Sequence, residues 1–278
     1  MESKALLAEK AKRIRQNIIE MLGHAKSGHP GGSLDLAEIM SVLYFDVMNY
    51  DFSDPNKADR DYLVLSKGHG APVLYATFCE GGLIEEEELT TLRQLGSRLQ
   101  GHPDRKKLPG VEASTGSLGQ GFGIASGIAL SMKLQQKPNR VYAVLGDGEL
   151  DEGIIWEAAM SAAHYGLDNL CAVVDNNGLQ IDGANDDVMA LGDIGAKFAA
   201  FGFEVFHVDG HDIEALQDVF AKAAEVKGRP SAIIAKTVKG KGVSFMENQA
   251  SWHGTAPNDE QYAQAMADLE KIGEGLGV

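Results

Sequence analysis

The feature that most constrains the fold is an alternation of apolar strands and helices in the C-terminal half of the chain. Four segments rich in Val, Ile, Leu and Ala are predicted as strands, at residues 141–145, 170–174, 203–208 and 231–237. Helices are predicted between them, at residues 152–165, 194–201 and 213–226. Apolar strands that alternate with helices are typical of a parallel sheet covered on both faces. The sequence therefore predicts an α/β fold, which we expect to be one domain over residues 1–278.

The N-terminal half is predicted to be mainly helical. Amphipathic periodicity favours helices at residues 6–26, 33–50, 85–95 and 117–133, with Ser33 as the N-cap of the second. A strand at residues 62–66 precedes a Lys-Gly-His-Gly turn and another helix, and residues 101–115 form a long polar loop. Because the Lys-Gly-His-Gly turn directly follows a strand, we expect it to lie at the edge of the sheet.

Composition excludes several classes of protein. The chain has 25 basic and 40 acidic residues, a net charge of −15, which argues against nucleic-acid and anionic-membrane binding. Its hydrophobic content of 44% is ample for a core and excludes intrinsic disorder. We find no signal peptide and no apolar run long enough to cross a membrane, and both cysteines, Cys79 and Cys171, lie in apolar stretches. We expect a cytoplasmic protein with reduced cysteines.

Polar residues follow two of the predicted strands directly. A Gly-Asp-Gly turn holds Asp147, and an Asn-Asn-Gly turn holds Asn177. Parallel sheets bind ligands beyond the carboxyl ends of their strands, so these two side chains are expected to lie close together. A carboxylate, an amide oxygen and a nearby backbone carbonyl suit a hard divalent cation, and the N-terminus of the following helix favours an anion. Either turn alone is ordinary turn chemistry, but the pair predicts a metal-bridged diphosphate.

Histidines and one lysine form a second group of candidates. Four of the eight histidines stand beside Gly or Pro in turns: His29, His69, His102 and His253. Such residues suit a site that needs donors near phosphate and hydroxyl groups. The other four are interpreted as structural or surface residues: His24, His164, His207 and His211. Lys239 lies in a Lys-Gly-Lys-Gly turn after the last strand, where a phosphate contact and a solvated loop are weighed equally.

Two other phosphate-binding motifs are excluded. A P-loop requires Gly-Lys followed by Ser or Thr, and this triplet does not occur. The glycine-rich run at residues 116–123 follows a polar loop instead of a strand, and Ser126 stands where a dinucleotide fingerprint requires Gly or Ala. A nucleotide-binding oxidoreductase is therefore disfavoured.

Several motifs occur one after another along the chain. They are SGHPGGSLDLAEIM, SKGHGAP, GHPD, TGSLGQG, GDGELDEG with the later Asn-Asn pair, and KTVKGKG with SWHG. This order resembles that found in transketolases. The GDG turn followed about 30 residues later by Asn-Asn has the spacing of the thiamine-diphosphate signature. Over residues 27–257 the chain resembles the N-terminal, diphosphate-binding (PP-type) half of a transketolase. The resemblance implies transfer of a two-carbon ketol unit from a ketose phosphate to an aldose phosphate, with the pentose phosphate pathway as the default setting.

The resemblance also implies roles for individual residues. It assigns the ligands of Mg²⁺ or Ca²⁺ to Asp147, Asn177 and the backbone carbonyl of Leu179. It assigns the contacts to the diphosphate to His69, Gly148, Lys239 and His253, and those to the aminopyrimidine to Gly116 and Leu118. His29 would bind sugar hydroxyls and move protons, with His69, His102 and His253 near the donor sugar. Glu152, linked to an activating glutamate of a partner, and Glu157 would lie at a subunit interface.

One departure from the family concerns length. Full-length transketolases carry a second domain that binds the aminopyrimidine and supplies the activating glutamate, followed by a third domain, whereas this chain ends after one predicted domain at Val278. It therefore resembles one half of a split transketolase, active only with a C-terminal partner subunit in an α₂β₂ assembly, or a truncated chain. The alternatives are a 1-deoxyxylulose-5-phosphate synthase-like or decarboxylating subunit and a non-catalytic regulatory subunit. The SGHPGG and SWHG segments favour transketolase.

Overall fold

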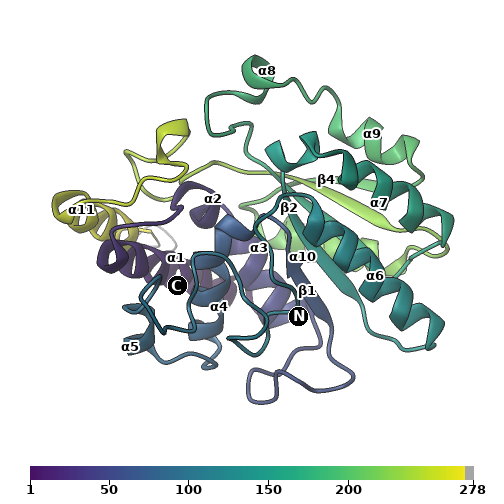
Figure 1. Cartoon of the computed structure of the whole chain (residues 1–278), viewed down its shortest axis with the longest axis horizontal. Helices are drawn as coiled ribbons and strands as arrows, with labels where there is room; N and C mark the ends of the chain where they lie inside the picture. Colours follow the sequence, from purple (N-terminus) through teal and green to yellow (C-terminus); the bar gives the residue numbers. More distant parts are fainter. Residues whose placement is uncertain (273–278) are drawn as a thin grey trace.

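A five-stranded parallel sheet forms the centre of the computed structural model, which describes residues 1–272 (Figure 1). The strands are β1 (Tyr62–Leu65), β2 (Val141–Gly146), β3 (Leu170–Asn176), β4 (Glu204–Asp209) and β5 (Ser231–Lys236). Their order is β1-β2-β3-β5-β4, and every neighbouring pair is parallel. The predicted α/β fold with a parallel sheet is confirmed, and each strand lies within two residues of its predicted bounds.

The sheet is buried on both faces because its central strands are apolar throughout. Side chains alternate between the faces of a strand, and Val144 and Leu145 of β2 accordingly belong to two separate apolar clusters. Neither side chain is exposed. The strands thus hold together two helical layers.

Each face of the sheet has its own helices. One cluster contains residues of α1 (Lys4–Ala25), α3 (Ala37–Val42), α4 (Ala71–Glu80), α10 (Ile213–Glu225) and α11 (Asp259–Glu270). The other contains residues of α6 (Gln120–Leu134), α7 (Gly153–His164) and α9 (Ile194–Ala200). Figure 1 shows the two groups on opposite sides of the strands. The predicted helices at residues 6–26, 152–165, 194–201 and 213–226 are confirmed.

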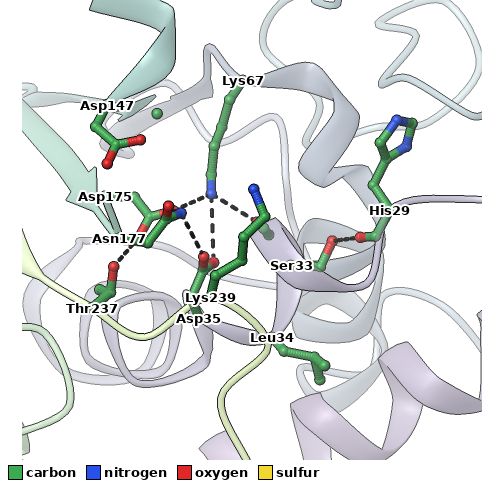
Figure 2. Close-up of polar contacts among 12 residues, drawn as sticks. His29, Ser33, Leu34, Asp35, Lys67, Asp147, Asp175, Asn177, Thr237 and Lys239 are labelled. Carbon is green, nitrogen blue, oxygen red and sulfur yellow. Dashed lines mark hydrogen bonds and ion pairs between the residues drawn. The ribbon is translucent and has the colours of Figure 1, made fainter. Parts of the chain in front are cut away.

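The prediction of one continuous helix at residues 33–50 is wrong. The segment divides into α2 (Gly31–Leu34), α3 and a π-helical turn η1 (Leu43–Val47). Ser33 is no N-cap, because it lies inside α2 and its hydroxyl donates to the backbone oxygen of His29 at 2.7 Å. Pro30 precedes the first helical residue of α2, and its φ of −71° suits a helix start. The break between α2 and α3 places Asp35 beneath the carboxyl edge of the sheet (Figure 2).

The predicted helix at residues 85–95 is also shorter than expected. Only α5 (Glu86–Leu89) is helical. Arg93 has a φ of 63°, which a right-handed helix does not contain, so the helix could not have continued through this residue. The remaining short elements are η2 (Gly68–Gly70), η3 (Gly148–Asp151), α8 (Asn185–Val188) and η4 (Ala250–Trp252). Residues 101–115 contain no helix or strand, as predicted. Within residues 1–272, no helix has the length and apolar character needed to cross a membrane.

Candidate active site

A cavity of about 320 Å³ opens beyond the carboxyl ends of β2 and β3. This is the edge where parallel α/β sheets place their ligand sites. The cavity brings together ten of the residues singled out in the sequence: His29, His69, Gly116, Leu118, Asp147, Gly148, Asn177, Leu179, Lys239 and His253. They come from segments spread over more than 200 residues of the chain, so the fold itself assembles the candidate site.

Asp147 and Asn177 line the same cavity because β2 and β3 are neighbouring parallel strands. The backbone nitrogen of Asp147 donates to the backbone oxygen of Asp175 at 3.1 Å. The Asp147 carboxylate accepts from the backbone nitrogens of Gly148 at 2.8 Å and Gly178 at 2.5 Å. Burial, and then the nearby Asp175, raise the pKa of Asp147 to about 6. A cation beside this carboxylate would relieve both effects.

The donor atoms in the cavity fit a hard divalent cation. Asp147 offers a carboxylate, Asn177 an amide oxygen that accepts from the Leu179 backbone nitrogen at 2.9 Å, and Leu179 a backbone carbonyl. Oxygen ligands of this kind suit Mg²⁺ or Ca²⁺, whereas Zn²⁺ favours sulfur and nitrogen. Across residues 1–272 no group of three or more His, Cys, Asp or Glu side chains is arranged to hold a metal. A metal bound here would therefore need the amide oxygen of Asn177 and the carbonyl oxygen of Leu179 in addition to the Asp147 carboxylate.

Two glycines bring backbone against the cavity where a side chain would not fit. A Cβ at Gly148 would lie 2.9 Å from Cγ of Gln180. A Cβ at Gly116 would lie 3.0 Å from the His102 ring, and Gly116 has a φ of 147°, which favours glycine. Both positions leave backbone groups accessible to a ligand.

The four candidate histidines form one group. The His29 ring lies 5.3 Å from His69, 6.3 Å from His102 and 5.4 Å from His253, measured between ring centroids. Burial, followed by Arg93, lowers the pKa of His29 to about 4, and burial, followed by Lys239, lowers that of His253 to about 3. Burial also lowers the pKa values of His69 and His102. The rings of His29 and His253 are therefore neutral at pH 7. Of the four histidines, His102 alone stands outside the cavity lining.

Lys239 is buried inside the site. Only 2% of the residue is exposed, so the solvated-loop interpretation is wrong for this lysine. Its ammonium group donates to the backbone oxygen of Leu179 at 3.2 Å and to Nδ1 of His253 at 3.1 Å. Burial lowers the pKa of Lys239, although the surrounding carboxylates oppose that effect. Its place in the cavity lining puts this ammonium group within reach of an anionic ligand.

Beneath the cavity lies a buried charge cluster that the sequence did not single out, consisting of Asp35, Lys67 and Asp175 (Figure 2). The Lys67 ammonium donates to Asp175, to the backbone oxygen of Gly32 at 2.7 Å and to Asp35 at 3.5 Å. Burial alone would raise the pKa of Asp175, but Lys67 outweighs it and holds that pKa below its usual value. Burial and Asp175 raise the pKa of Asp35.

Glu149 is a second residue that sequence reasoning missed. Its carboxylate accepts from the Ser66 hydroxyl at 2.5 Å, the Gly119 backbone nitrogen at 2.8 Å and the Gly146 backbone nitrogen at 3.1 Å. These bonds join the ends of β1 and β2 to the start of α6. In the sequence, Glu149 stands in an acidic run that gave no sign of its burial.

Glu152 and Glu157 lie apart from the other candidates. Both are exposed, at the start of α7 and within it, and neither lines the cavity. Among the histidines interpreted as structural, His211 contacts the Glu38 carboxylate at 2.9 Å and accepts from the Val238 backbone nitrogen at 2.9 Å. His211 therefore links α3 to the segment after β5, outside the site.

The family described as "Transketolase, thiamine diphosphate binding domain" matches residues 7–271 of the chain. The chain is 42% identical to SqwG, the 6-deoxy-6-sulfo-D-fructose transketolase subunit of Clostridium sp., over 96% of this chain and 97% of that protein. It is 38% identical to one of the subunits of the apulose-4-phosphate transketolase of Phocaeicola vulgatus, over 96% of this chain and 94% of that protein.

Longer relatives match over part of their length. Human transketolase is 46% identical over 89% of this chain and 39% of its own length. The crystal structure of transketolase from Campylobacter jejuni superposes with a TM-score of 0.91 and 34% identity, over 97% of this chain and 43% of that chain. The chain thus spans about two fifths of these relatives and nearly the whole of the two subunits.

Proposed function

This chain belongs to the transketolase family, and we propose that it is the thiamine-diphosphate-binding subunit of a split transketolase. In this proposal it transfers a two-carbon ketol unit from a ketose phosphate to an aldose phosphate, together with a separate C-terminal subunit that binds the pyrimidine. The proposal covers one PP-type domain over residues 1–278. The coverage of 97% and 94% of two relatives that are themselves named subunits supports it.

The observation that carries the proposal is the set of groups around the cavity. Asp147, Asn177 and the Leu179 carbonyl would hold Mg²⁺ or Ca²⁺, and the buried ammonium of Lys239 would face the diphosphate. His69, Gly148 and His253 would complete the diphosphate contacts, while Gly116 and Leu118 would line the aminopyrimidine. When bound, thiamine diphosphate supplies a nucleophilic carbon and a ring that accepts electrons during carbon–carbon cleavage.

The histidines would handle the sugar and its protons. Because their pKa values are lowered, the rings of His29 and His253 are neutral at pH 7. Nδ1 of each ring faces a cationic donor, so Nε2 would carry the proton and could donate a hydrogen bond to a sugar hydroxyl. His69 and His102 flank His29 and would serve the same donor sugar. Because the rings of His29 and His253 are neutral, Lys239 would supply the positive charge that faces the diphosphate.

The partner would supply what this chain lacks. We propose that an activating glutamate comes from the C-terminal subunit, that Glu152 and Glu157 face it, and that two copies of each subunit form an α₂β₂ assembly. The exposure of Glu152 at the start of α7 and of Glu157 within α7 is compatible with such an interface. We also propose a cytoplasmic location, in keeping with two cysteines that form no disulfide.

The proposed activity is tested by reconstitution. The chain and a candidate pyrimidine-binding subunit are purified separately, then assayed alone and mixed, with xylulose 5-phosphate as donor and ribose 5-phosphate as acceptor. Ketol transfer by the mixture and none by either protein alone is the expected result. Decarboxylation of pyruvate by the mixture would instead favour a decarboxylating enzyme, and normal turnover by this chain alone would rule out the split-subunit arrangement.

A further inference from the structure

The side-chain amide of Asn177 is held from below by two carboxylates. Its nitrogen donates to Asp35 at 3.0 Å and to Asp175 at 3.2 Å (Figure 2). An amide nitrogen has two hydrogens, and both are used by these acceptors. The amide oxygen must then point the other way, where it meets the Leu179 backbone nitrogen at the cavity. The orientation of Asn177 is therefore set by its acceptors.

Asp175 has other partners, whereas Asp35 has few. Asp175 also accepts from the Lys67 ammonium and from the Thr237 hydroxyl. The shortest side-chain contact of Asp35 is the one to Asn177, since its distance to the Lys67 ammonium is 3.5 Å.

Pairing with Lys67 does not explain Asp35 either. Lys67 already forms a closer buried ion pair with Asp175, and its ammonium nitrogen lies 3.5 Å from Asp35. The Asp35 side chain is completely buried, and burying a carboxylate costs free energy unless other interactions compensate. A carboxylate at this place therefore points to a positioning role.

Asp35 lies at the junction between α2 and α3. From there it reaches Asn177, which is 142 positions away in the sequence.

We propose that Asp35 is a positioning residue of the metal site, which holds the Asn177 amide so that its oxygen faces the cavity. The inference rests on the proposed function, because it concerns the same site. Groups that orient metal ligands typically change metal affinity by about 10-fold to 100-fold when they are removed. Asp35 would act through Asn177 without touching the metal.

The first test reads the amide itself and needs no ligand. The full chain is labelled with ¹⁵N-asparagine, and the Asn177 side-chain resonances are identified by their loss in Asn177→Ala. We expect slow hydrogen exchange of this amide in the wild type and in Asp35→Asn, which keeps an oxygen acceptor, and faster exchange in Asp35→Leu. Thr237→Val is the matched control, because it removes a bond to the same cluster but leaves both acceptors of Asn177 in place.

The second test measures Mg²⁺ affinity in the presence of thiamine diphosphate by calorimetry. We expect Asp35→Leu to weaken Mg²⁺ binding by about 10-fold or more, with Asp35→Asn and Thr237→Val close to the wild type. Unchanged amide exchange in Asp35→Leu, or an equal effect of Thr237→Val, would overturn the positioning role. If Asp147→Ala binds Mg²⁺ as the wild type does, the proposed metal site fails, while the exchange result still decides the role of Asp35.

Discussion

Nδ1 of His253 lies 3.1 Å from the ammonium nitrogen of Lys239, and both residues line the same cavity. An ammonium group can only donate, so Nδ1 accepts and the ring proton resides on Nε2. The contact therefore fixes the tautomer of a histidine that the proposed function places beside the diphosphate and the sugar. It also opposes protonation of the ring.

Removing the lysine should make His253 more basic. Burial is the largest cause of the lowered pKa of about 3 and Lys239 is the next, so Lys239→Met should raise this pKa while leaving it below the usual value. NMR titration of the ring C–H resonances measures the change. Lys241→Met is the matched control, because Lys241 lies in the same turn but pairs with Glu247. An unchanged His253 titration would contradict this account.

Arg93 should have a similar effect on His29. Its guanidinium lies 3.4 Å from Nδ1 of His29, and it is the second cause, after burial, of a pKa near 4. Arg93→Gln should raise the His29 pKa in the same NMR titration. Arg98→Gln provides the control, because that arginine is paired with Glu88. Equal shifts in the two variants would show that the contact has no specific role.

The lowered pKa of His29 predicts how stability depends on pH. The unfolded chain binds a proton at His29 below about pH 6.5, whereas the folded chain does so only near pH 4. The free energy of unfolding should therefore fall as the pH drops from 7 to 4. His29→Asn should lose less stability over this range than the wild type, as measured by urea denaturation. A variant that parallels the wild type at every pH would refute the prediction.

Asp147 should be required for metal-dependent cofactor binding. Asp147→Ala removes the only carboxylate among the three proposed oxygen ligands, so we expect loss of Mg²⁺-dependent thiamine diphosphate binding by the assembled complex. Calorimetry with and without EDTA measures the binding. Asp186→Ala, at an exposed position of α8, should bind like the wild type. Retained binding in Asp147→Ala would remove this residue from the proposed ligand set.

Lys67 should matter most for stability. Lys67→Met leaves the buried carboxylates of Asp35 and Asp175 without their shared cation, which typically costs about 3–5 kcal/mol. Urea denaturation should show this loss in the free energy of unfolding. Lys57→Met serves as the control, because Lys57 is a half-exposed lysine paired with Asp59. A loss no larger than that of the control would mean that the cluster does not stabilise the fold.

The sequence predicted the contacts that depend on strand order along the chain. Asp147 and Asn177 each follow an apolar strand, and neighbouring parallel strands bring such residues together whatever the details of packing. It did not predict Asp35, whose surroundings in the sequence have the periodicity of a helix. In the structure this carboxylate lies at the junction between α2 and α3 and contacts a residue in the other half of the chain.

Lys67 and Lys239 show a related limit. Both stand in glycine-rich turns, where a lysine is usually solvated. Their burial follows from long-range packing against β3 and the segment after it, which no local pattern encodes. The same holds for Arg93, whose left-handed backbone lies inside a segment where the amphipathic periodicity favoured a helix.

The Lys67 cluster joins the α2–α3 junction, the end of β1 and the end of β3. During protein synthesis, a nascent chain that has left the ribosome only as far as β2 lacks Asp175, so the floor of the cavity cannot yet exist. Binding of the coenzyme can consequently occur only late in biogenesis, after the N-terminal and C-terminal segments of this polypeptide have folded against each other.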